Sequence, residues 1–445
     1  MEKFDILIIG GGPGGYEVAA EQAAAGHNVA LVERAELGGT CLNRGCIPTK
    51  CLCATASRVL SIRSANEFGI KTDGATVDYK AATERMRSVV DGLRESVADA
   101  LKNVTVICGE ASITPDGYVA VDNRTYSAAR VLIATGSRPA RLPIPGAEYA
   151  LTSDDFFSGT HELPKRLVII GGGVIGIEFA SIYNALGVDV TVLEFCREIL
   201  PGFDSDVAKR LRMALQARGV RFATGAQATS IEPGYRVNYT TRRGEETADA
   251  DAVLMATGRV PIVPAGVCEA GIELTERGFI AVDESMRTTR EGFYAAGDVT
   301  GICMLAHAAT AQARVALGCD GQEPELNIIP ASVFSVPEAS MVGLTKEQCE
   351  AHGVECATVR CNYAANGKAL ADGASGFVKI VYSPATRLIL GVHVLGEHAS
   401  DLVAEAAALI YGMTTIDELA TDLVHGHPTL SELLPMAAKS ALQHT

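Results

Sequence analysis

The sequence contains no tryptophan, and aromatic residues make up only 5% of its 445 positions. It also has no basic tract, and its formal net charge is −15. A chain this acidic is a poor ligand for nucleic acid or acidic membranes, so neither is expected as a partner. Glycine and charged residues interrupt the apolar runs, so no membrane-spanning helix is expected. The overall composition, 48% hydrophobic and 20% charged, is that of an ordinary globular protein.

Few residues precede the first predicted strand, which begins at Phe4. This leaves no room for a signal peptide, and a cytoplasmic protein is expected. The twelve cysteines are scattered through the chain and do not form a compact disulfide framework. In a reducing compartment most of them are expected to be free thiols. A disulfide that persists there is more typical of catalysis than of structure.

The N-terminal segment has the pattern of a dinucleotide-binding unit. A buried strand, a glycine-rich turn, a helix over 16–25 and a second strand follow one another, and Glu33 ends the unit. The glycines with the G-x-G-x-x-G spacing are Gly10, Gly12 and Gly15. The first permits the tight turn, the second lets the backbone approach a pyrophosphate, and the third packs the helix on the strand. Glu33 would accept hydrogen bonds from a ribose diol.

The same unit returns over residues 166–194, with a helix expected over 177–185. Its glycines are Gly171, Gly173 and Gly176, and Glu194 ends its second strand at the same offset as Glu33 in the first copy. One such fingerprint is a weak signal, but two in full strand–turn–helix–strand context predict two dinucleotide sites. The carboxylate of Glu194 would repel a 2′-phosphate, so NAD is expected over NADP at the second site.

Three further segments are candidates for cofactor contact. The strand-to-turn segments 131–136 and 253–258 resemble each other, and each could return the chain to one dinucleotide. A short strand at 293–295 leads into Gly297-Asp298. Asp298 is either a ligand for a polyol hydroxyl or an ordinary turn aspartate.

Cys41 and Cys46 closely follow the first fingerprint. On a regular helix, Cα atoms five residues apart are roughly 8–9 Å from each other, whereas a disulfide needs about 4.4–6.8 Å. A bond between the two cysteines therefore requires a distorted first turn, which Gly45 would permit. The spacing alone is more typical of unpaired cysteines, but the adjacent cofactor site favours a redox-active pair. Arg44, between them, either tunes thiolate stability or faces an acidic carrier protein.

Cys51 and Cys53 follow this pair and raise the alternative of a metal cluster. The spacing lacks the paired C-x₂-C pattern of structural zinc sites, so no metal is expected. No role can be assigned to Cys51 or Cys53 from the sequence.

Residues from about 329 onward carry no dinucleotide fingerprint. Two antiparallel strands over 378–382 and 388–394, with an apolar helix over 400–411, predict an interface domain. Near the end of the chain, His427 is a candidate proton acceptor for thiol chemistry, and Glu432 could orient its imidazole. The simpler alternative is a surface pair without function.

These segments together resemble the flavin-dependent pyridine nucleotide–disulfide oxidoreductases, over essentially the whole chain. The similarity is strongest to members that act on dihydrolipoamide. It implies an α/β fold with two Rossmann-like dinucleotide-binding domains and an α+β C-terminal dimerisation domain. The implied units are an FAD-binding domain with the redox-active disulfide (1–145), an NAD-binding domain (146–265), a central domain that completes the FAD site (266–328) and an interface domain (329–445).

The resemblance also implies the cofactors FAD and NAD and the residues that contact them. The expected FAD contacts are Gly10, Gly12, Gly14, Gly15, Glu33, Thr40, Lys50, Ala111, Thr135, Gly136, Asp298, Met304, Leu305 and Ala306. The expected NAD contacts are Gly171, Gly173, Val174, Ile175, Gly176, Glu194, Ala228 and Gly258. The implied catalytic residues are Cys41 toward the substrate, Cys46 toward the flavin, Lys50 paired with Glu178, and His427 with Glu432 from the second subunit of a homodimer.

The implied reaction is oxidation of protein-bound dihydrolipoyl groups through a Cys41–Cys46 disulfide and FAD, with hydride passed to NAD⁺. The implied partner is the lipoyl-bearing carrier or acyltransferase protein of a 2-oxoacid dehydrogenase, acetoin or glycine-cleavage system. One alternative is a disulfide reductase for glutathione, trypanothione or mercuric ion, which Glu194 disfavours. Another is a non-catalytic flavoprotein that serves as a redox sensor or scaffold, which the intact set of catalytic residues disfavours.

Overall fold

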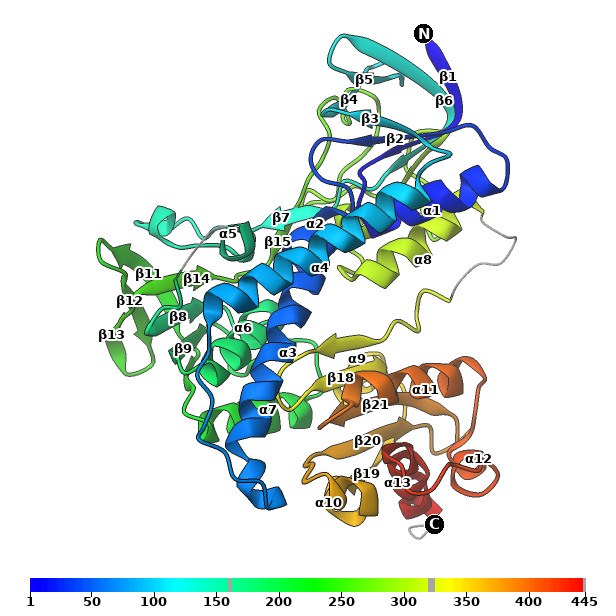
Figure 1. Cartoon of the computed structure of the whole chain (residues 1–445). Coiled ribbons are helices and arrows are strands. Elements are labelled where there is room, and N and C mark those ends of the chain that lie inside the picture. Colours follow the sequence, from blue (N-terminus) through cyan, green and yellow to red (C-terminus); the bar gives the residue numbers. More distant parts are fainter. Residues whose placement is uncertain (159–161, 319–324, 443–445) are drawn as a thin grey trace.

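The computed structural model describes residues 1–158, 162–318 and 325–442. Its first sheet, at the top of Figure 1, has the strand order β3-β2-β1-β6-β5-β4, and β16 also pairs with β6. The strands are β1 (Glu2–Ile9), β2 (Val29–Glu33), β3 (Thr105–Cys108), β4 (Ala111–Ile113), β5 (Val119–Val121), β6 (Arg124–Ile133) and β16 (Phe293–Ala295). Strand β1 is parallel to β2 and β6, and β16 is parallel to β6. The segment after the second fingerprint therefore contributes to the first sheet.

Helices pack around this sheet and extend from it across the molecule. They are α1 (Pro13–Ala24), α2 (Gly39–Arg44), α3 (Cys46–Arg63), α4 (Tyr79–Ala100) and α8 (Ala306–Leu317). Helix α8 lies beside α1, and the long helices α3 and α4 run through the middle of the molecule (Figure 1). Short 3₁₀ turns add η1 (Ala65–Phe68) after α3 and η3 (Gly297–Thr300) before α8.

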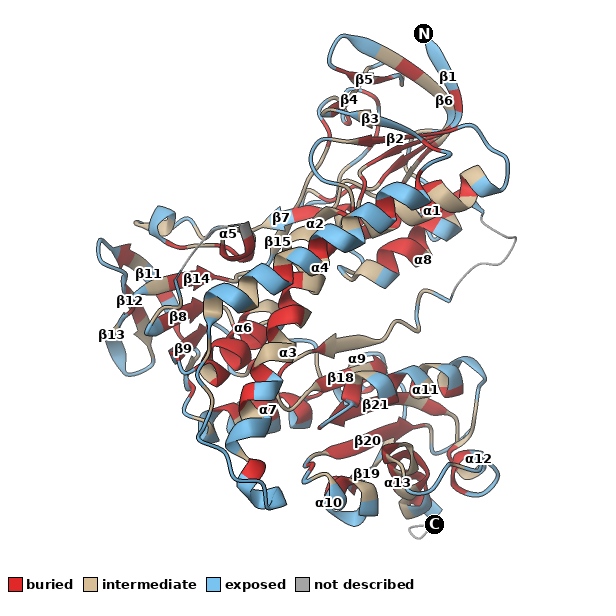
Figure 2. Cartoon of the chain, viewed as in Figure 1, coloured by how far each residue is buried: buried red, intermediate tan, exposed pale blue. Residues whose placement is uncertain are grey.

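The second sheet is wholly parallel, with the order β10-β9-β8-β14. Its strands are β8 (Arg166–Ile170), β9 (Asp189–Glu194), β10 (Arg221–Thr224) and β14 (Ala252–Met255), and its helices are α6 (Val174–Ala185) and α7 (Ser205–Ala217). Smaller elements beside it are β7 (Ser137–Pro139), η2 (Ala147–Tyr149), α5 (Ser153–Ser158), β11 (Gln227–Glu232), β12 (Arg236–Thr241), β13 (Gly244–Asp249) and β15 (Arg259–Pro261). Helix α6 is buried along most of its length, as its red colour in Figure 2 shows.

The two helices after the glycine turns start earlier than predicted. Helix α1 begins at Pro13, not at residue 16, and α6 begins at Val174, not at residue 177. The second glycine of each fingerprint is the N-cap of the helix and has extended dihedral angles. The helix begins at the next residue. Pro13 fits its position because proline is tolerated at the first helical residue. The first turn of each helix thus lies directly against the glycine turn.

The C-terminal domain is an antiparallel sheet with the order β17-β18-β21-β20-β19. Its strands are β17 (Ala331–Val333), β18 (Ala339–Gly343), β19 (Ala357–Asn362), β20 (Phe377–Tyr382) and β21 (Ile389–Leu395). Its helical segments are α9 (Lys346–Ala351), η5 (Tyr363–Ala365), α10 (Gly367–Ala371), α11 (Ala399–Tyr411), α12 (Ile416–Thr421), η6 (Leu430–Glu432) and α13 (Leu433–Leu442). The predicted antiparallel pair and the helix after it are confirmed as β20, β21 and α11.

A cluster of three charges, two of them buried, joins the second sheet's domain to the C-terminal domain. The ammonium of Lys379 on β20 donates to Asp204 Oδ2 and Asp206 Oδ2, each at 2.8 Å, at the start of α7. The side chains of Lys379 and Asp204 are only 8% and 0% exposed, so each charge needs the other as its partner. The three charges therefore fix β20 against α7. Within the described parts of the chain, no helix has the length and apolarity that crossing a membrane requires.

Candidate active site

The two cysteines lie on either side of a break between two helices. Cys41 is in α2, Cys46 is the first residue of α3, and Gly45 separates the helices with φ −139° and ψ −107°. A Cβ atom at Gly45 would lie 3.0 Å from the Thr40 carbonyl oxygen, tighter than most side chains tolerate. Both cysteines are free thiols in hydrogen-bonding contact. The predicted distortion at Gly45 is therefore confirmed.

The contact between the thiols makes the two sulfurs unequal. The hydrogen bond from Cys41 lowers the pKa of Cys46, and the positive charge of Lys50 adds to this effect, while burial opposes it. The same hydrogen bond and burial raise the pKa of Cys41 well above its usual range. Because a thiolate accepts hydrogen bonds and cannot donate them, the lowered pKa makes Cys46 the first of the two to lose its proton, with Cys41 as the donor.

Lys50 is held between a carboxylate and an aromatic ring. Its Nζ atom lies 3.0 Å from Glu178 Oε1 on α6 and 4.1 Å from the centre of the Phe334 ring. The same Glu178 oxygen accepts a hydrogen bond from the Phe334 backbone amide at 2.9 Å. Cys53 Sγ donates to the Phe334 carbonyl oxygen at 3.0 Å, and burial raises the pKa of this thiol to about 12. The expected Lys50–Glu178 pair is present, whereas no sequence pattern points to Phe334.

The first and third glycines of each fingerprint are required by close backbone contacts. Gly10 and Gly171 both have φ +112°, and a Cβ atom on either would lie 2.3 Å from a carbonyl oxygen of the neighbouring strand-to-turn segment. A Cβ atom on Gly15 or Gly176 would lie 1.9 or 2.0 Å from the carbonyl oxygen of the first glycine. A larger residue at any of these positions would displace the turn.

The middle glycines differ, because the space beside them is open. A Cβ atom on Gly173 would meet nothing within 4 Å, and one on Gly12 would meet only the Gly39 Cα atom at 3.9 Å. Each lies at the N-terminus of a helix, where backbone amide groups and the helix dipole favour a phosphate. Both turns therefore fit the pyrophosphate of a dinucleotide.

The two acids occupy matching positions in the two copies. Glu33 accepts hydrogen bonds from the amides of Gly11 at 2.6 Å and Ala35 at 2.8 Å. Glu194 accepts from the amides of Gly172 at 2.5 Å and Cys196 at 2.6 Å. Each carboxylate is thus fixed at the end of its strand. Both still have free lone pairs with which to accept from a ribose diol.

One pocket collects several of the expected FAD contacts at the edge of the first sheet. Its lining includes Gly10, Glu33, Ala111 and Thr135. The hydroxyl of Thr135 donates to the Ile262 carbonyl oxygen at 2.5 Å, which closes one wall. Residues from four separate segments, at β1, β2, β4 and β6, therefore converge where the adenosine part of a dinucleotide would lie.

Asp298 lies at the start of η3, where its carboxylate already has protein partners. Its Oδ2 atom accepts from the Ser137 hydroxyl and lies 3.6 Å from Arg259 Nε. Arg259 Nε also donates to the Ser137 hydroxyl at 2.6 Å. These contacts orient the carboxylate, and its remaining lone pairs are available to a polyol hydroxyl.

Most of the remaining expected cofactor contacts lie at the starts of α1, α2, α6 and α8. Gly14 packs on Ala309 of α8, Thr40 is exposed on α2, and Leu305 is the N-cap of α8, so that Met304 precedes and Ala306 begins this helix. Val174 and Ile175 open α6, Gly136 and Gly258 have positive φ, and Ala228 is buried on β11.

His427 and Glu432 form a pair in the C-terminal domain. His427 Nδ1 lies 3.0 Å from Glu432 Oε1, and the His427 side chain is 80% exposed. The Thr429 amide also donates to Glu432 Oε2 at 2.9 Å, which fixes the carboxylate. In the described residues no hydrogen bond joins this pair to the cysteines of the same chain, and Figure 1 shows α2 and α13 in different parts of the molecule. One subunit alone therefore does not bring the imidazole to the thiols.

Two other charged features lie outside this arrangement. The Arg44 guanidinium pairs with Glu36 at the surface, so a nearby carboxylate holds it in place.

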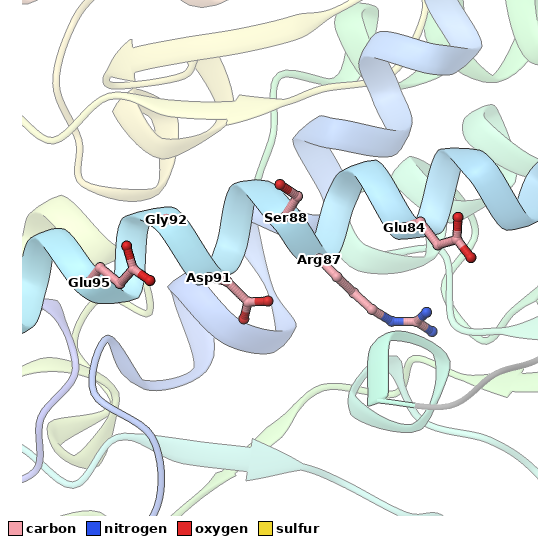
Figure 3. A pocket seen from close by; sticks show the side chains of 6 residues that line it. All are labelled: Glu84, Arg87, Ser88, Asp91, Gly92 and Glu95. Carbon is pink, nitrogen blue, oxygen red and sulfur yellow. The ribbon is translucent and has the colours of Figure 1, made fainter.

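A hollow on the exposed side of α4 is lined by Glu84, Arg87, Ser88, Asp91, Gly92 and Glu95 (Figure 3). Its lining has carboxylates and one guanidinium but no thiol or imidazole, so the chemistry of the cysteines lies elsewhere.

Comparison with known proteins identifies the family. A model of pyridine nucleotide-disulphide oxidoreductases matches residues 4–313, and a model of the dimerisation domain of this family matches residues 329–438. The chain belongs to the pyridine nucleotide-disulphide oxidoreductases. The family expected from the sequence is confirmed, as are its cofactors, FAD and NAD(H). The C-terminal sheet is the dimerisation domain, and the protein is a homodimer.

Individual members of this family resemble the chain along its full length. Dihydrolipoyl dehydrogenase of Chlamydia pneumoniae is 38% identical, with 100% of this chain and 98% of that protein covered. The enzyme of the same name from Geobacillus stearothermophilus is 37% identical, with 98% and 96% covered. Among solved structures, a Cu(II) complex of the HOCl-induced flavoprotein disulfide reductase RclA from Escherichia coli has a TM-score of 0.86 at 29% identity, with 99% and 100% covered.

Proposed function

We propose that the protein is a dihydrolipoyl dehydrogenase that oxidises protein-bound dihydrolipoyl groups and reduces NAD⁺. The observation that carries this proposal is the unequal thiol pair, with Cys46 as thiolate beside Lys50 and Cys41 as its donor. An exchange disulfide needs one sulfur that leaves easily as a thiolate and one that the substrate can attack. The full-length similarity to enzymes named dihydrolipoyl dehydrogenase supports the choice of substrate.

The proposed reaction starts from the Cys41–Cys46 disulfide. His427 of the partner subunit accepts a proton from one substrate thiol, while Glu432 of the partner subunit stabilises the charged imidazole. The substrate thiolate attacks Cys41 Sγ, and Cys46 leaves as a thiolate. The second substrate thiol then attacks the substrate sulfur bound to Cys41, which releases the cyclic lipoyl disulfide and the Cys41 thiol. Two cysteines are thereby reduced and two substrate thiols oxidised.

The cofactors would lie in the two glycine turns, FAD against Gly12 and Glu33 and the nicotinamide against Gly173 and Glu194. Bound there, FAD would supply the two-electron redox chemistry that links the dithiol to the nicotinamide. Lys50 places a positive charge near the Cys46 thiolate, and Glu178 holds that ammonium in place. The remaining expected cofactor contacts and the domain boundaries at 145, 265 and 328 are part of the same proposal. The natural substrate would be the lipoyl group of a carrier or acyltransferase in a 2-oxoacid dehydrogenase, acetoin or glycine-cleavage system.

A pair of steady-state assays tests this assignment. We expect NAD-dependent oxidation of free dihydrolipoamide to be fast and NADPH- or NADH-dependent reduction of oxidised glutathione to be negligible. Activity in the second assay alone would make the protein a reductase for another disulfide. A flavin-containing protein with activity in neither would instead support the sensor or scaffold alternative.

A further inference from the structure

The segment between β17 and β18 is fixed to α6 by two of its backbone amides. Phe334 directly follows β17, and its amide donates to Glu178 Oε1 at 2.9 Å. Two residues further on, the Val336 amide donates to the Ser181 hydroxyl oxygen at 2.9 Å. Glu178 and Ser181 are both buried and lie three residues apart, on one face of α6. The start of the dimerisation domain is therefore held in a defined position against this helix.

Phe334 also contacts α3, on the face that carries Lys50. Its carbonyl oxygen accepts a hydrogen bond from Cys53 Sγ at 3.0 Å. Its half-buried ring lies under Lys50 Nζ, which is 4.1 Å from the ring centre. Lys50 and Cys53 are three residues apart and thus neighbours on α3. One residue therefore contacts α6 through its amide, and α3 through both its carbonyl oxygen and its ring.

The position of the Lys50 ammonium matters because Cys46 lies four residues before it, on the same face of α3. Side chains of a helix lean toward its N-terminus, where Cys46 lies. Besides the Cys41 thiol, the charge of Cys46 responds to the ammonium, which stabilises the thiolate, and to the Glu178 carboxylate, which opposes it. A lysine stem is flexible, and this side chain is 32% exposed. Glu178 contacts the ammonium at 3.0 Å, and the face of the Phe334 ring covers it from a second direction.

We propose that Phe334 is a positioning residue that holds the Lys50 ammonium beside Cys46. Cys53 acts one step further away, because its hydrogen bond fixes the Phe334 peptide. The negative face of the ring attracts the ammonium. Without the ring, the ammonium would spend more time away from Cys46, and the thiolate would lose part of its stabilisation. The catalytic meaning of this position rests on the proposed function, in which Cys46 leaves as a thiolate when the substrate attacks Cys41.

The pH dependence of Cys46 alkylation by iodoacetamide in the reduced, flavin-loaded protein tests this role. Trypsin cleavage after Arg44 and Lys50 releases Cys46 as the only cysteine of the peptide Gly45–Lys50, so mass spectrometry measures it separately. Phe334→Leu removes the ring but keeps an apolar side chain and the backbone contacts. We expect the pH of half-maximal alkylation to rise by about half a unit or more. Phe334→Tyr keeps an aromatic face and should retain the unmodified midpoint.

Two further comparisons separate positioning from general destabilisation. Phe279→Leu removes another ring that faces a cation, Arg277 at 5.8 Å from the ring centre, and should leave the midpoint of Cys46 unchanged. Cys53→Ala should raise this midpoint, by less than Phe334→Leu does. Cys53→Ser keeps a donor for the Phe334 carbonyl and should not raise it.

The outcomes that would overturn the proposal are specific. One is an unchanged midpoint in a Phe334→Leu protein that retains its flavin and its circular dichroism spectrum. Another is an equal rise in Phe279→Leu. If Phe334→Leu does not fold, equal midpoints in Cys53→Ala and Cys53→Ser would overturn it instead. The titration uses no lipoyl substrate, so absence of dihydrolipoamide oxidation in the unmodified protein would refute the proposed function and not the position of Lys50.

Discussion

The thiol of Cys53 donates a hydrogen bond to the carbonyl oxygen of Phe334, with sulfur and oxygen 3.0 Å apart. Phe334 in turn places its ring 4.1 Å from Lys50 Nζ and its amide on Glu178. Helix α3 and the start of the dimerisation domain are thereby linked around the Lys50 ammonium, whose charge lowers the pKa of Cys46. Several consequences of this arrangement and of the cofactor sites can be measured.

Loss of the Cys53 hydrogen bond should be visible in stability. Cys53→Ala leaves the Phe334 carbonyl without this donor, and we expect the free energy of unfolding to fall by about 1 kcal/mol. Cys53→Ser keeps a donor and should recover most of this loss. Chemical denaturation of both variants, followed by circular dichroism, measures the difference. Equal destabilisation by alanine and serine would show that packing of the sulfur, and not the hydrogen bond, matters.

Replacement of Cys46 by serine should separate thiol chemistry from flavin chemistry. We expect Cys46→Ser to lose at least about a thousandfold in dihydrolipoamide oxidation, because the sulfur that forms the redox disulfide with Cys41 and leaves as a thiolate is removed. The protein should remain yellow and should still transfer electrons from NADH to an artificial quinone acceptor, which needs no thiol. Absorbance spectra and the two assays measure both expectations. Retained dihydrolipoamide turnover would eliminate the pair as the redox centre.

The charge state of Cys46 should depend on Cys41. The hydrogen bond from Cys41 lowers the pKa of Cys46, so in the reduced protein Cys46 stays a thiolate at pH values below the ordinary thiol value of about 8.5. Cys41→Ala removes this donor, and the pKa of Cys46 should rise. Cys46 should then become protonated and unreactive at a higher pH than in the unmodified protein.

This pKa shift can be measured from the rate at which iodoacetamide alkylates Cys46 at different pH values. Mass spectrometry quantifies the alkylated cysteine. Alkylation of the exposed Cys108 in the same samples corrects for the reagent. An unchanged pH profile in Cys41→Ala would mean that Lys50 alone lowers the pKa of Cys46.

Coenzyme choice should follow from the carboxylate of Glu194. We expect a clear preference for NAD over NADP, because a 2′-phosphate would meet a fixed negative charge. Glu194→Gln removes this charge but keeps an acceptor oxygen, and the ratio of kcat/KM for the two coenzymes should fall at least about tenfold, or about 1.4 kcal/mol. Glu232→Gln, an exposed carboxylate on β11, serves as the control and should leave the ratio unchanged. A preference for NADP in the unmodified protein would refute the assignment of Glu194.

A shared active site can be tested with hybrid dimers. We expect Cys46→Ser and His427→Gln homodimers each to be inactive. A hybrid of the two has one site with both residues intact if His427 acts on the partner's cysteines, and none if it acts within its own chain. Random association makes roughly half of the dimers hybrids, so co-expression should restore about a quarter of the unmodified activity. No recovery in a preparation shown by mass spectrometry to contain hybrids would place the imidazole in its own chain.

The features that the sequence predicts well are local in the chain. The glycine turns, their acids and the break at Gly45 each depend on neighbouring residues and on backbone geometry. The predicted starts of α1 and α6 were wrong. Each helix begins directly after the middle glycine of its fingerprint, and hydrophobic periodicity alone does not show this. Lys50 and Glu178 were paired only through the family resemblance.

Other contacts leave no pattern that a single sequence could reveal. Cys53 meets Phe334 from a distant part of the chain, and nothing marks the two residues as partners before the domains are assembled. The sequence left two possible roles for Arg44. Its pairing with Glu36 depends on the direction in which α2 leaves β2, which the sequence does not show.

The pairing of β16 with β6 also constrains the order in which the molecule can form. The N-terminal sheet gains this strand only when residues 293–295 are available, after the entire domain of the second sheet. On the ribosome, the side of β6 at residues 131–133 that later pairs with β16 is therefore an unpaired edge while the intervening domain is synthesised and folds. Synthesis that stalls before residue 293 would leave this edge open to aggregation, and a chaperone would find its binding site there.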